Sequence, residues 1–245
     1  MKEAKLSLVD VRKSFKSHAV LNGINLAVAQ GEMMCLIGSS GSGKSTLLRC
    51  MNVLEPVDDG YVYLDGVDIS EPGLDLSAIR RRIGIVFQSF NLFPHMTALE
   101  NVLLAPRRVY NKTKSAVLPQ AEHLFERFSL SDHMHKYPDQ LSGGQQQRLA
   151  VIRALAMEPE IMLFDEITSA LDPELVGEVL DLLRQLRDEG MTMVLATHEM
   201  GFARELADTI CFIDGGSILE QAPPEVIFQG PKHSRTKAFL TNVLK

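Results

Sequence analysis

The chain has 245 residues, of which 45% are hydrophobic and 23% charged, and its formal net charge is −6. This composition is typical of a soluble globular protein, and the length is enough for one large α/β domain, with room for a subdomain. No stretch is rich enough in Lys and Arg to suggest binding of nucleic acid or anionic lipid.

The N-terminal residues 1–5 lead into no apolar signal core, and no segment approaches about 20 uninterrupted apolar residues, so we expect no membrane span. The three cysteines, Cys35, Cys50 and Cys211, lie in apolar runs. We interpret them as buried hydrophobic residues in a reducing compartment. The densest basic run, Arg80–Arg82, is interpreted as the solvated end of a helix.

The first segments favour a small antiparallel sheet. Residues 6–11 and 24–28 alternate in polarity, as half-exposed strands do. We expect them to pair with residues 61–64, which an Asp-Gly turn at 65–66 closes. Phe15 lies between the first two strands and is followed by Lys16, Ser17 and His18.

A phosphate-binding loop is predicted next. The apolar run 32–37 indicates a buried strand and residues 44–51 indicate a helix. Between them the pattern G-x-x-x-x-G-K-[ST] is formed by Gly38, Ser39, Ser40, Gly41, Ser42, Gly43, Lys44, Ser45 and Thr46. The glycines let backbone N–H groups turn toward an anion, and the helix N-terminus adds its dipole. Lys44 would reach the β- and γ-phosphates and Ser45 would ligate Mg²⁺. The alternative is a flexible Gly/Ser loop.

The middle of the chain is predicted to be mainly helical. Residues 75–80 indicate a short helix, and 83–87 indicate a core strand that ends at Gln88. Thr97 and Glu100 form a capping box for a helix that stops near Pro106, and another helix covers 115–128. We therefore expect residues 90–156 to form a helical subdomain inserted into a core made of 1–89 and 157–245.

A second helix start has unusual chemistry. Ser142 and Gln145 repeat the capping-box spacing before a helix that runs to about residue 157. The glycines between them leave N–H groups exposed at a positive helix end, which makes a second anion site. One chain has no evident use for two distant phosphate sites, whereas two chains arranged head to tail would use both. The alternative is simply a well-capped helix.

The remaining segments alternate between strands and helices. Core strands are expected at 160–164 and 191–196, a hairpin at 208–220, and a short helical tail at the end. Asp172 and Pro173 favour a helix start, and Gly190 ends that helix. This order indicates an α/β fold with a mainly parallel sheet covered on both faces.

Polar residues follow four of the core strands: the Gly38 loop, Gln88, Asp165 with Glu166, and His198. Ligands of open α/β sheets bind at the carboxyl edge, so we expect these groups to converge. There Asp165 would hold Mg²⁺ and Glu166 would accept a proton from the attacking water. Gln88 would orient that water or contact the metal, and His198 would bond the γ-phosphate. The alternative for each is a polar residue that points into water.

These motifs together resemble the ATP-binding cassette (ABC) ATPases. The Gly38 loop is similar to the Walker A motif, 161–166 to Walker B, Gln88 to the Q-loop and His198 to the switch histidine. The signature motif corresponds to Leu141, Ser142, Gly143, Gly144 and Gln145, and the D-loop to Ser169, Ala170, Leu171 and Asp172. The resemblance implies a P-loop NTPase (RecA-like) core, ATP with Mg²⁺, and a homodimer with nucleotide between the subunits. It also implies that Phe15 stacks on adenine, unless Phe15 is a core aromatic.

A narrower resemblance links residues 91–97, 169–174, 197–200 and 235–240 to the ATPase subunits of polar amino acid importers. It implies a peripheral protein on the cytoplasmic face of the cell (inner) membrane, with integral membrane permease partners. It also implies an indirect partnership with an extracytoplasmic solute-binding protein, and no nucleic acid partner. The exposed apolar residues Leu92, Phe93 and Met96 are candidates for the docking surface. One departure is Ile167, which stands where the family usually has proline and leaves the stiffness of that loop open.

Other classes remain alternatives. An exporter would use the same chemistry. A soluble ABC ATPase acting on DNA or the ribosome usually has a long coiled-coil insertion or a second cassette, and this chain has neither. A small-molecule kinase would have no use for the 142–145 motif, and a non-catalytic switch would have no use for Glu166 and His198.

Overall fold

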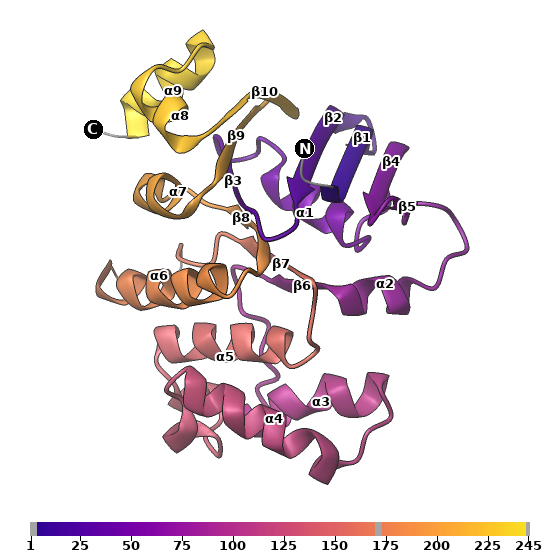
Figure 1. Ribbon diagram of the computed structural model, residues 1–245, viewed down its shortest axis with the longest axis vertical. Helices are drawn as coiled ribbons and strands as arrows, with labels where there is room; N and C mark the ends of the chain where they lie inside the picture. The colour runs from indigo at the N-terminus through magenta and orange to yellow at the C-terminus, as the bar shows by residue number, and fades with distance from the viewer. Residues whose placement is uncertain (1–3, 170–172, 244–245) are drawn as a thin grey trace.

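The computed structural model describes residues 4–169 and 173–243, which form two sheets and the helices packed on them (Figure 1). The smaller sheet is antiparallel and has the order β2-β1-β4-β5. Its strands are β1 (Ala4–Phe15), β2 (His18–Ala29), β4 (Asp59–Leu64) and β5 (Val67–Asp68). The predicted small antiparallel sheet is thus present, with longer strands than expected. The register extends to the pair Phe15 and His18, so Phe15 ends a strand rather than lying in a connection.

The larger sheet has the order β10-β9-β3-β8-β7-β6. Neighbouring strands from β9 to β6 are parallel, and β10 pairs antiparallel with β9. Its strands are β3 (Met33–Ile37), β6 (Ile83–Val86), β7 (Ile161–Asp165), β8 (Thr192–Ala196), β9 (Thr209–Asp214) and β10 (Ser217–Ala222). The prediction of a mainly parallel α/β sheet is confirmed.

The helices follow the predicted order, with one clear difference. They are α1 (Lys44–Met51), α2 (Leu76–Arg82), α3 (Ala98–Val109), α4 (Lys114–Arg127), α5 (Gly143–Leu155), α6 (Pro173–Asp188), α7 (Met200–Leu206), α8 (Pro224–Gln229) and α9 (Ser234–Val243), with short 3₁₀ turns at Ser131–His133 and Pro138–Gln140. The expectation that a helix stops near Pro106 was wrong, because α3 runs on to Val109. Pro106 is buried, and its carbonyl accepts a hydrogen bond from the N–H of Tyr110 at 3.2 Å. Near a helix C-terminus proline removes one N–H donor, and its burial offsets that loss.

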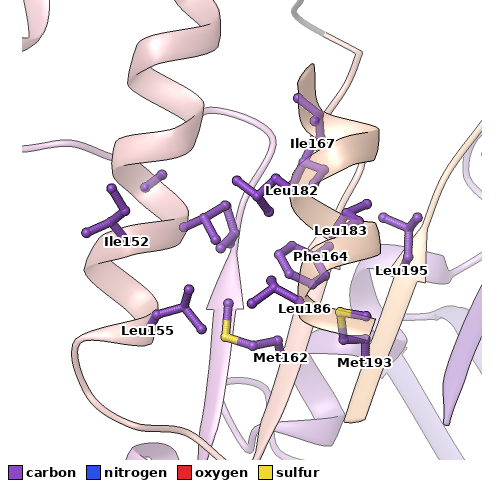
Figure 2. Close-up of a cluster of buried hydrophobic side chains, with 14 of the residues drawn as sticks. Ile152, Leu155, Met162, Phe164, Ile167, Leu182, Leu183, Leu186, Met193 and Leu195 are labelled. Atoms are coloured by element: carbon purple, nitrogen blue, oxygen red, sulfur yellow. The ribbon is translucent and has the colours of Figure 1, made fainter. Parts of the chain in front are cut away.

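Both faces of the large sheet are covered. All five residues of β3 are buried. Successive side chains of β3 point to opposite faces of the sheet. Met33, Cys35 and Ile37 therefore belong to one apolar cluster, and Met34 and Leu36 belong to the other. The first cluster joins the sheet to α3–α7, and Figure 2 shows its part between α5, the sheet and α6. The second lies between the sheet, α1 and the small sheet. The helices of the 90–156 segment therefore share a core with α6 and the sheet.

The basic run Arg80–Arg82 ends α2, as expected from the sequence, but it also makes specific contacts. Arg82 Nε donates to Glu160 Oε1 at 2.5 Å, and Arg82 also pairs with Asp65. Arg80 donates to the carbonyl of Val53 at 2.7 Å. These contacts connect the β4–β5 turn to the residue before β7, so the run ties the two sheets together.

The cysteines are buried and unpaired, as predicted. Burial raises the pKa of the Cys35 and Cys50 thiols to about 12, so both are protonated near neutral pH. Across the two described segments, no helix is long and apolar enough to cross a membrane.

Candidate nucleotide site

The loop from Gly38 to Thr46 joins β3 to α1 and depends on glycine geometry. Gly38 has φ 155°, and a Cβ there would lie 2.2 Å from the carbonyl oxygen of Ile213. Gly43, the N-cap of α1, has φ 106° and provides no side-chain cap. The first turn of α1 also lacks an acidic residue, so its N–H groups are left for an external anion.

Lys44 is held inside this loop. Its side chain is 3% exposed, and Nζ donates to the carbonyls of Gly38 and Ser39 at 3.0 and 3.1 Å. Burial lowers the pKa of Lys44, and the nearby Glu166 carboxylate opposes that shift. The ammonium therefore has few solvent contacts, and an anion bound in the loop would compensate its burial.

Glu166 and His198 meet beside Lys44, although they follow different strands. Glu166 Oε1 lies 2.8 Å from His198 Nε2 and 3.6 Å from Lys44 Nζ. Glu166 has φ 48°, a left-handed conformation that costs a non-glycine residue about 1–3 kcal/mol. Its N–H donates to Ala196 at 2.9 Å, and its carbonyl accepts from the N–H and Oγ of Ser169 at 3.1 and 2.8 Å. These bonds hold the carboxylate toward the loop.

Ile167, which follows Glu166, helps to hold that backbone by packing. Its side chain is 1% exposed and belongs to the first apolar cluster. Figure 2 shows it beside Leu182 of α6. Burial of an isoleucine side chain contributes about 1.5–3 kcal/mol, so packing anchors the residue after Glu166.

Two oxygen groups suited to Mg²⁺ lie next to the loop. Ser45 Oγ donates to Asp165 Oδ1 at 2.7 Å, and Asp165 is 5% exposed. Burial raises the pKa of Asp165, while the Ser45 hydrogen bond lowers it. A divalent cation prefers such hard oxygen ligands and would compensate the buried carboxylate, so the pair fits a magnesium site.

A cavity of about 460 Å³ opens in front of these groups. Its lining includes Phe15, Gln88, Lys44 and Glu166. Phe15 is 45% exposed, so it is not a core aromatic. His18 also lines the cavity, as does Val20, and our sequence reasoning missed both. The signal that could have found them is the strand register, because β2 begins directly opposite Phe15.

The second predicted anion site lies apart from this cavity. Ser142 is the exposed N-cap of α5: its Oγ accepts from the N–H of Gln145 at 3.3 Å, and Gln145 Oε1 accepts from the N–H of Ser142 at 3.0 Å. The Ser142 hydroxyl hydrogen and the N–H groups of Gly143 and Gly144 remain as donors. Leu141 is buried. Of the predicted D-loop, Ser169 is described above, whereas Ala170, Leu171 and Asp172 lie outside the described residues, as does the expected helix cap at Asp172.

Comparison with known proteins decides the family. Residues 21–169 match the model of a family described as "ABC transporter". The chain belongs to the ABC transporter ATPases. It is 53% identical to the glutamine transport ATP-binding protein GlnQ of Geobacillus stearothermophilus, over 96% of this chain and 97% of that protein. It is 49% identical to the L-cystine import ATP-binding protein TcyC of Bacillus subtilis, over 98% of each. Among solved structures, the dimeric structure of MJ0796, a bacterial ABC transporter cassette, has a TM-score of 0.81 and 36% identity, over 89% of this chain and 98% of that one.

In this ABC ATPase, the segment after Gln88 is held by two side chains that sequence reasoning missed, the half-buried Arg153 and the buried Asn101. Arg153 of α5 donates to the carbonyls of Asn91 and Phe90 at 2.6 and 2.8 Å. Asn101 of α3 is fully buried and bonds both the N–H and the carbonyl of Phe93. No local pattern marks either residue, because the partners of Arg153 lie about sixty residues earlier in the chain.

An apolar groove of about 590 Å³ follows this segment, between α2, β6 and α3. Phe93 lines it and is 39% exposed, as expected of a docking residue. The expectation that Leu92 and Met96 are exposed was wrong, because both are half-buried and Leu92 packs on the first apolar cluster.

Proposed function

We propose that this chain is the ATP-hydrolysing subunit of a bacterial importer that takes up a polar amino acid through a separate integral membrane permease. The convergence of Lys44, Glu166 and His198 at the mouth of the Gly38 loop is the observation that carries the enzymatic part. The amino acid part is supported by relatives named for glutamine transport and L-cystine import. An extracytoplasmic solute-binding protein would deliver the amino acid, and this chain would sit on the cytoplasmic face of the membrane.

The site residues have separate roles in this proposal. The N–H groups of the Gly38 loop and Lys44 bind the triphosphate, and Phe15 stacks on the adenine. Ser45 and Asp165, with Gln88, hold Mg²⁺, which would neutralise phosphate charge. Glu166 accepts the proton of the attacking water, and His198 hydrogen-bonds the γ-phosphate. The 2.8 Å contact of His198 with Glu166 keeps the two groups together beside Lys44.

The signature motif acts in a second copy of the chain. Its free donors, at Ser142, Gly143 and Gly144, suit an anion but do not line the cavity that contains Lys44. Two chains head to tail would place the donors of each chain against the γ-phosphate bound by the other. Hydrolysis would remove that bridge and reopen the dimer.

The groove that contains Phe93 would receive the permease. The groove is mainly apolar at its base, and its size suits a short helix or loop of a partner. Because Arg153 connects the signature helix α5 to residues 90 and 91, closure of the dimer would move the docking segment.

Reconstitution of the subunit with its permease in proteoliposomes tests this proposal. Uptake of radiolabelled glutamine and cystine should require ATP, and Glu166→Gln should abolish uptake and hydrolysis together. Phe93→Asp should uncouple the two, leaving basal ATPase intact while uptake is lost. Val226→Asp is a matched control, because Val226 is similarly exposed at 38% and lies on α8. Normal uptake by Phe93→Asp would refute the docking assignment. ATPase activity of the wild-type complex without amino acid uptake would refute the cargo.

A further inference from the structure

A second hollow, of about 750 Å³, lies beside the apolar groove. It is bounded by α3, the connection that follows it and the first residue of α4, and it shares Leu104 and Arg108 with the groove. Figure 1 places this connection on the same side of the molecule as α2, at the end opposite α8 and α9. The hollow is therefore continuous with the surface assigned above to the permease.

The charge of this hollow is opposite to that of the chain. Its lining contains Arg107, Arg108, Lys112 and Lys114 but a single carboxylate, that of Glu100. The whole chain, in contrast, has 31 acidic and 25 basic residues. The sequence alone suggested no site for anionic lipid, because these four cations are spread over eight residues. The turn that ends α3 brings them to one hollow.

Among the side chains of residues 4–169 and 176–243, none forms an acidic ion pair with the four cations, whereas Arg82, Arg127 and Arg184 are all ion-paired. The Glu100 carboxylate is already engaged, because one of its oxygens accepts from the N–H and the hydroxyl of Thr97 at 2.8 and 2.9 Å. Four cations against one carboxylate therefore leave the lining of the hollow with a net positive charge.

Part of this charge is positioned by packing. Two cations lie near the Tyr110 ring, with Lys112 Nζ 5.2 Å and Arg81 Cζ 5.7 Å from its centroid. Its hydroxyl donates to the carbonyl of Met157 at 3.0 Å, and this bond holds the ring next to the C-terminal end of α5. The next residue, Asn111, has φ 52°, and this turn directs the chain back toward α4.

The two adjoining cavities suit different partners. The groove has an apolar base, as a protein interface needs at its centre. The hollow is lined mainly by polar atoms and its rim is cationic, which suits an anion more than an apolar side chain. We propose that this hollow binds the phosphate headgroups of anionic phospholipids next to the permease. The inference rests on the proposed function, in which docking to the permease would turn this face toward the membrane surface.

Binding to vesicles tests the inference without permease or ATP, so its failure can be told apart from failure of the proposed function. The full chain is sedimented with phosphatidylcholine vesicles that contain or lack phosphatidylglycerol. The test variant carries Arg107→Gln, Lys112→Gln and Lys114→Gln and leaves Arg108, which also lines the groove, in place. The matched control carries Arg204→Gln, Lys232→Gln and Lys237→Gln, three exposed cations on other elements that give the same net charge.

The wild type and the control should bind the phosphatidylglycerol vesicles, and neither should bind phosphatidylcholine alone. The test variant should bind at least tenfold more weakly, since each surface cation contributes about fivefold. Binding should fall in about 1 M salt, where the Debye length is about 3 Å. Urea unfolding of each variant shows that it is folded.

Three results would overturn the inference. Equal binding by both triple variants would exclude the hollow as the site. A second result is that the wild type binds inorganic phosphate but no vesicles, and that the test variant loses phosphate binding. That result would assign the hollow to a free anion. Normal vesicle binding by a test variant that no longer co-purifies with the permease would assign it to an acidic protein segment.

Discussion

Glu166 Oε1 lies 2.8 Å from His198 Nε2, at the mouth of a loop whose lysine is 3.6 Å from the same carboxylate oxygen. The two residues follow neighbouring parallel strands, β7 and β8, so the sheet itself sets their separation. A left-handed backbone at Glu166 and a buried side chain at Ile167 then fix the direction of the carboxylate.

Glu166→Gln should lower the rate of ATP hydrolysis by about 10²- to 10⁴-fold, the usual contribution of a general base. ATP binding should persist, because the Gly38 loop and Lys44 are unchanged. A phosphate-release assay and a nucleotide-binding assay measure the two effects. Glu225→Gln on α8, which removes an exposed carboxylate elsewhere, should leave both unchanged. Wild-type turnover in Glu166→Gln would remove Glu166 from its assigned role.

Ile167→Ala should lower the free energy of unfolding by about 2–4 kcal/mol, since it removes buried methyl groups from the first apolar cluster. It should also slow hydrolysis, because the residue that anchors the Glu166 backbone is lost. Urea unfolding and steady-state ATPase measure these effects. Val226→Ala, at an exposed position, should change stability by less than about 0.5 kcal/mol. Unchanged stability of Ile167→Ala would show that packing does not hold this loop.

Arg153→Gln should lower the free energy of unfolding by about 1–3 kcal/mol, because the carbonyls of Phe90 and Asn91 lose their donors. Burial lowers the pKa of Arg153, and its guanidinium donates to backbone carbonyls. Stimulation of ATPase by the permease should fall more than basal ATPase does. Arg204→Gln, at an exposed site on α7, is the control. An equal loss of both activities would argue against a coupling role.

Sequence predicted the features that depend on local patterns. The Gly38 loop, the strands β3, β6, β7 and β8, and the capping box at Thr97 are each encoded by residues within one short segment, so spacing was sufficient. The convergence of Gln88, Glu166 and His198 followed from a general rule about parallel sheets.

Contacts between distant segments could not be predicted. Arg153 reaches residues about sixty positions earlier, and Arg82 joins Asp65 to Glu160, yet neither arginine stands in a pattern that names its partner. Pro106 indicated a helix end locally, but burial of its ring in the tertiary structure outweighed the missing donor.

Stability at low pH should depend on Glu160. The Arg82 hydrogen bond lowers the pKa of Glu160 to about 2, from an ordinary value of 4.5. Because the folded pKa is depressed, its stabilisation is present above about pH 4.5 and is lost as the pH falls toward 2. Glu160→Gln should therefore be less stable than wild type at pH 7, and the difference should shrink by pH 3. Urea midpoints at several pH values measure this, with Glu225→Gln as control. A difference that does not change with pH would contradict the assignment.

The shared nucleotide site can be tested by the mass of the ATP-bound protein. Sedimentation of Glu166→Gln with Mg·ATP should give a mass of twice the 27.2 kDa of one chain. The double variant that also carries Gly143→Asp should sediment as a monomer, because a carboxylate at the start of α5 repels the phosphate. A Glu166→Gln protein that binds ATP and still sediments at 27.2 kDa would contradict the account.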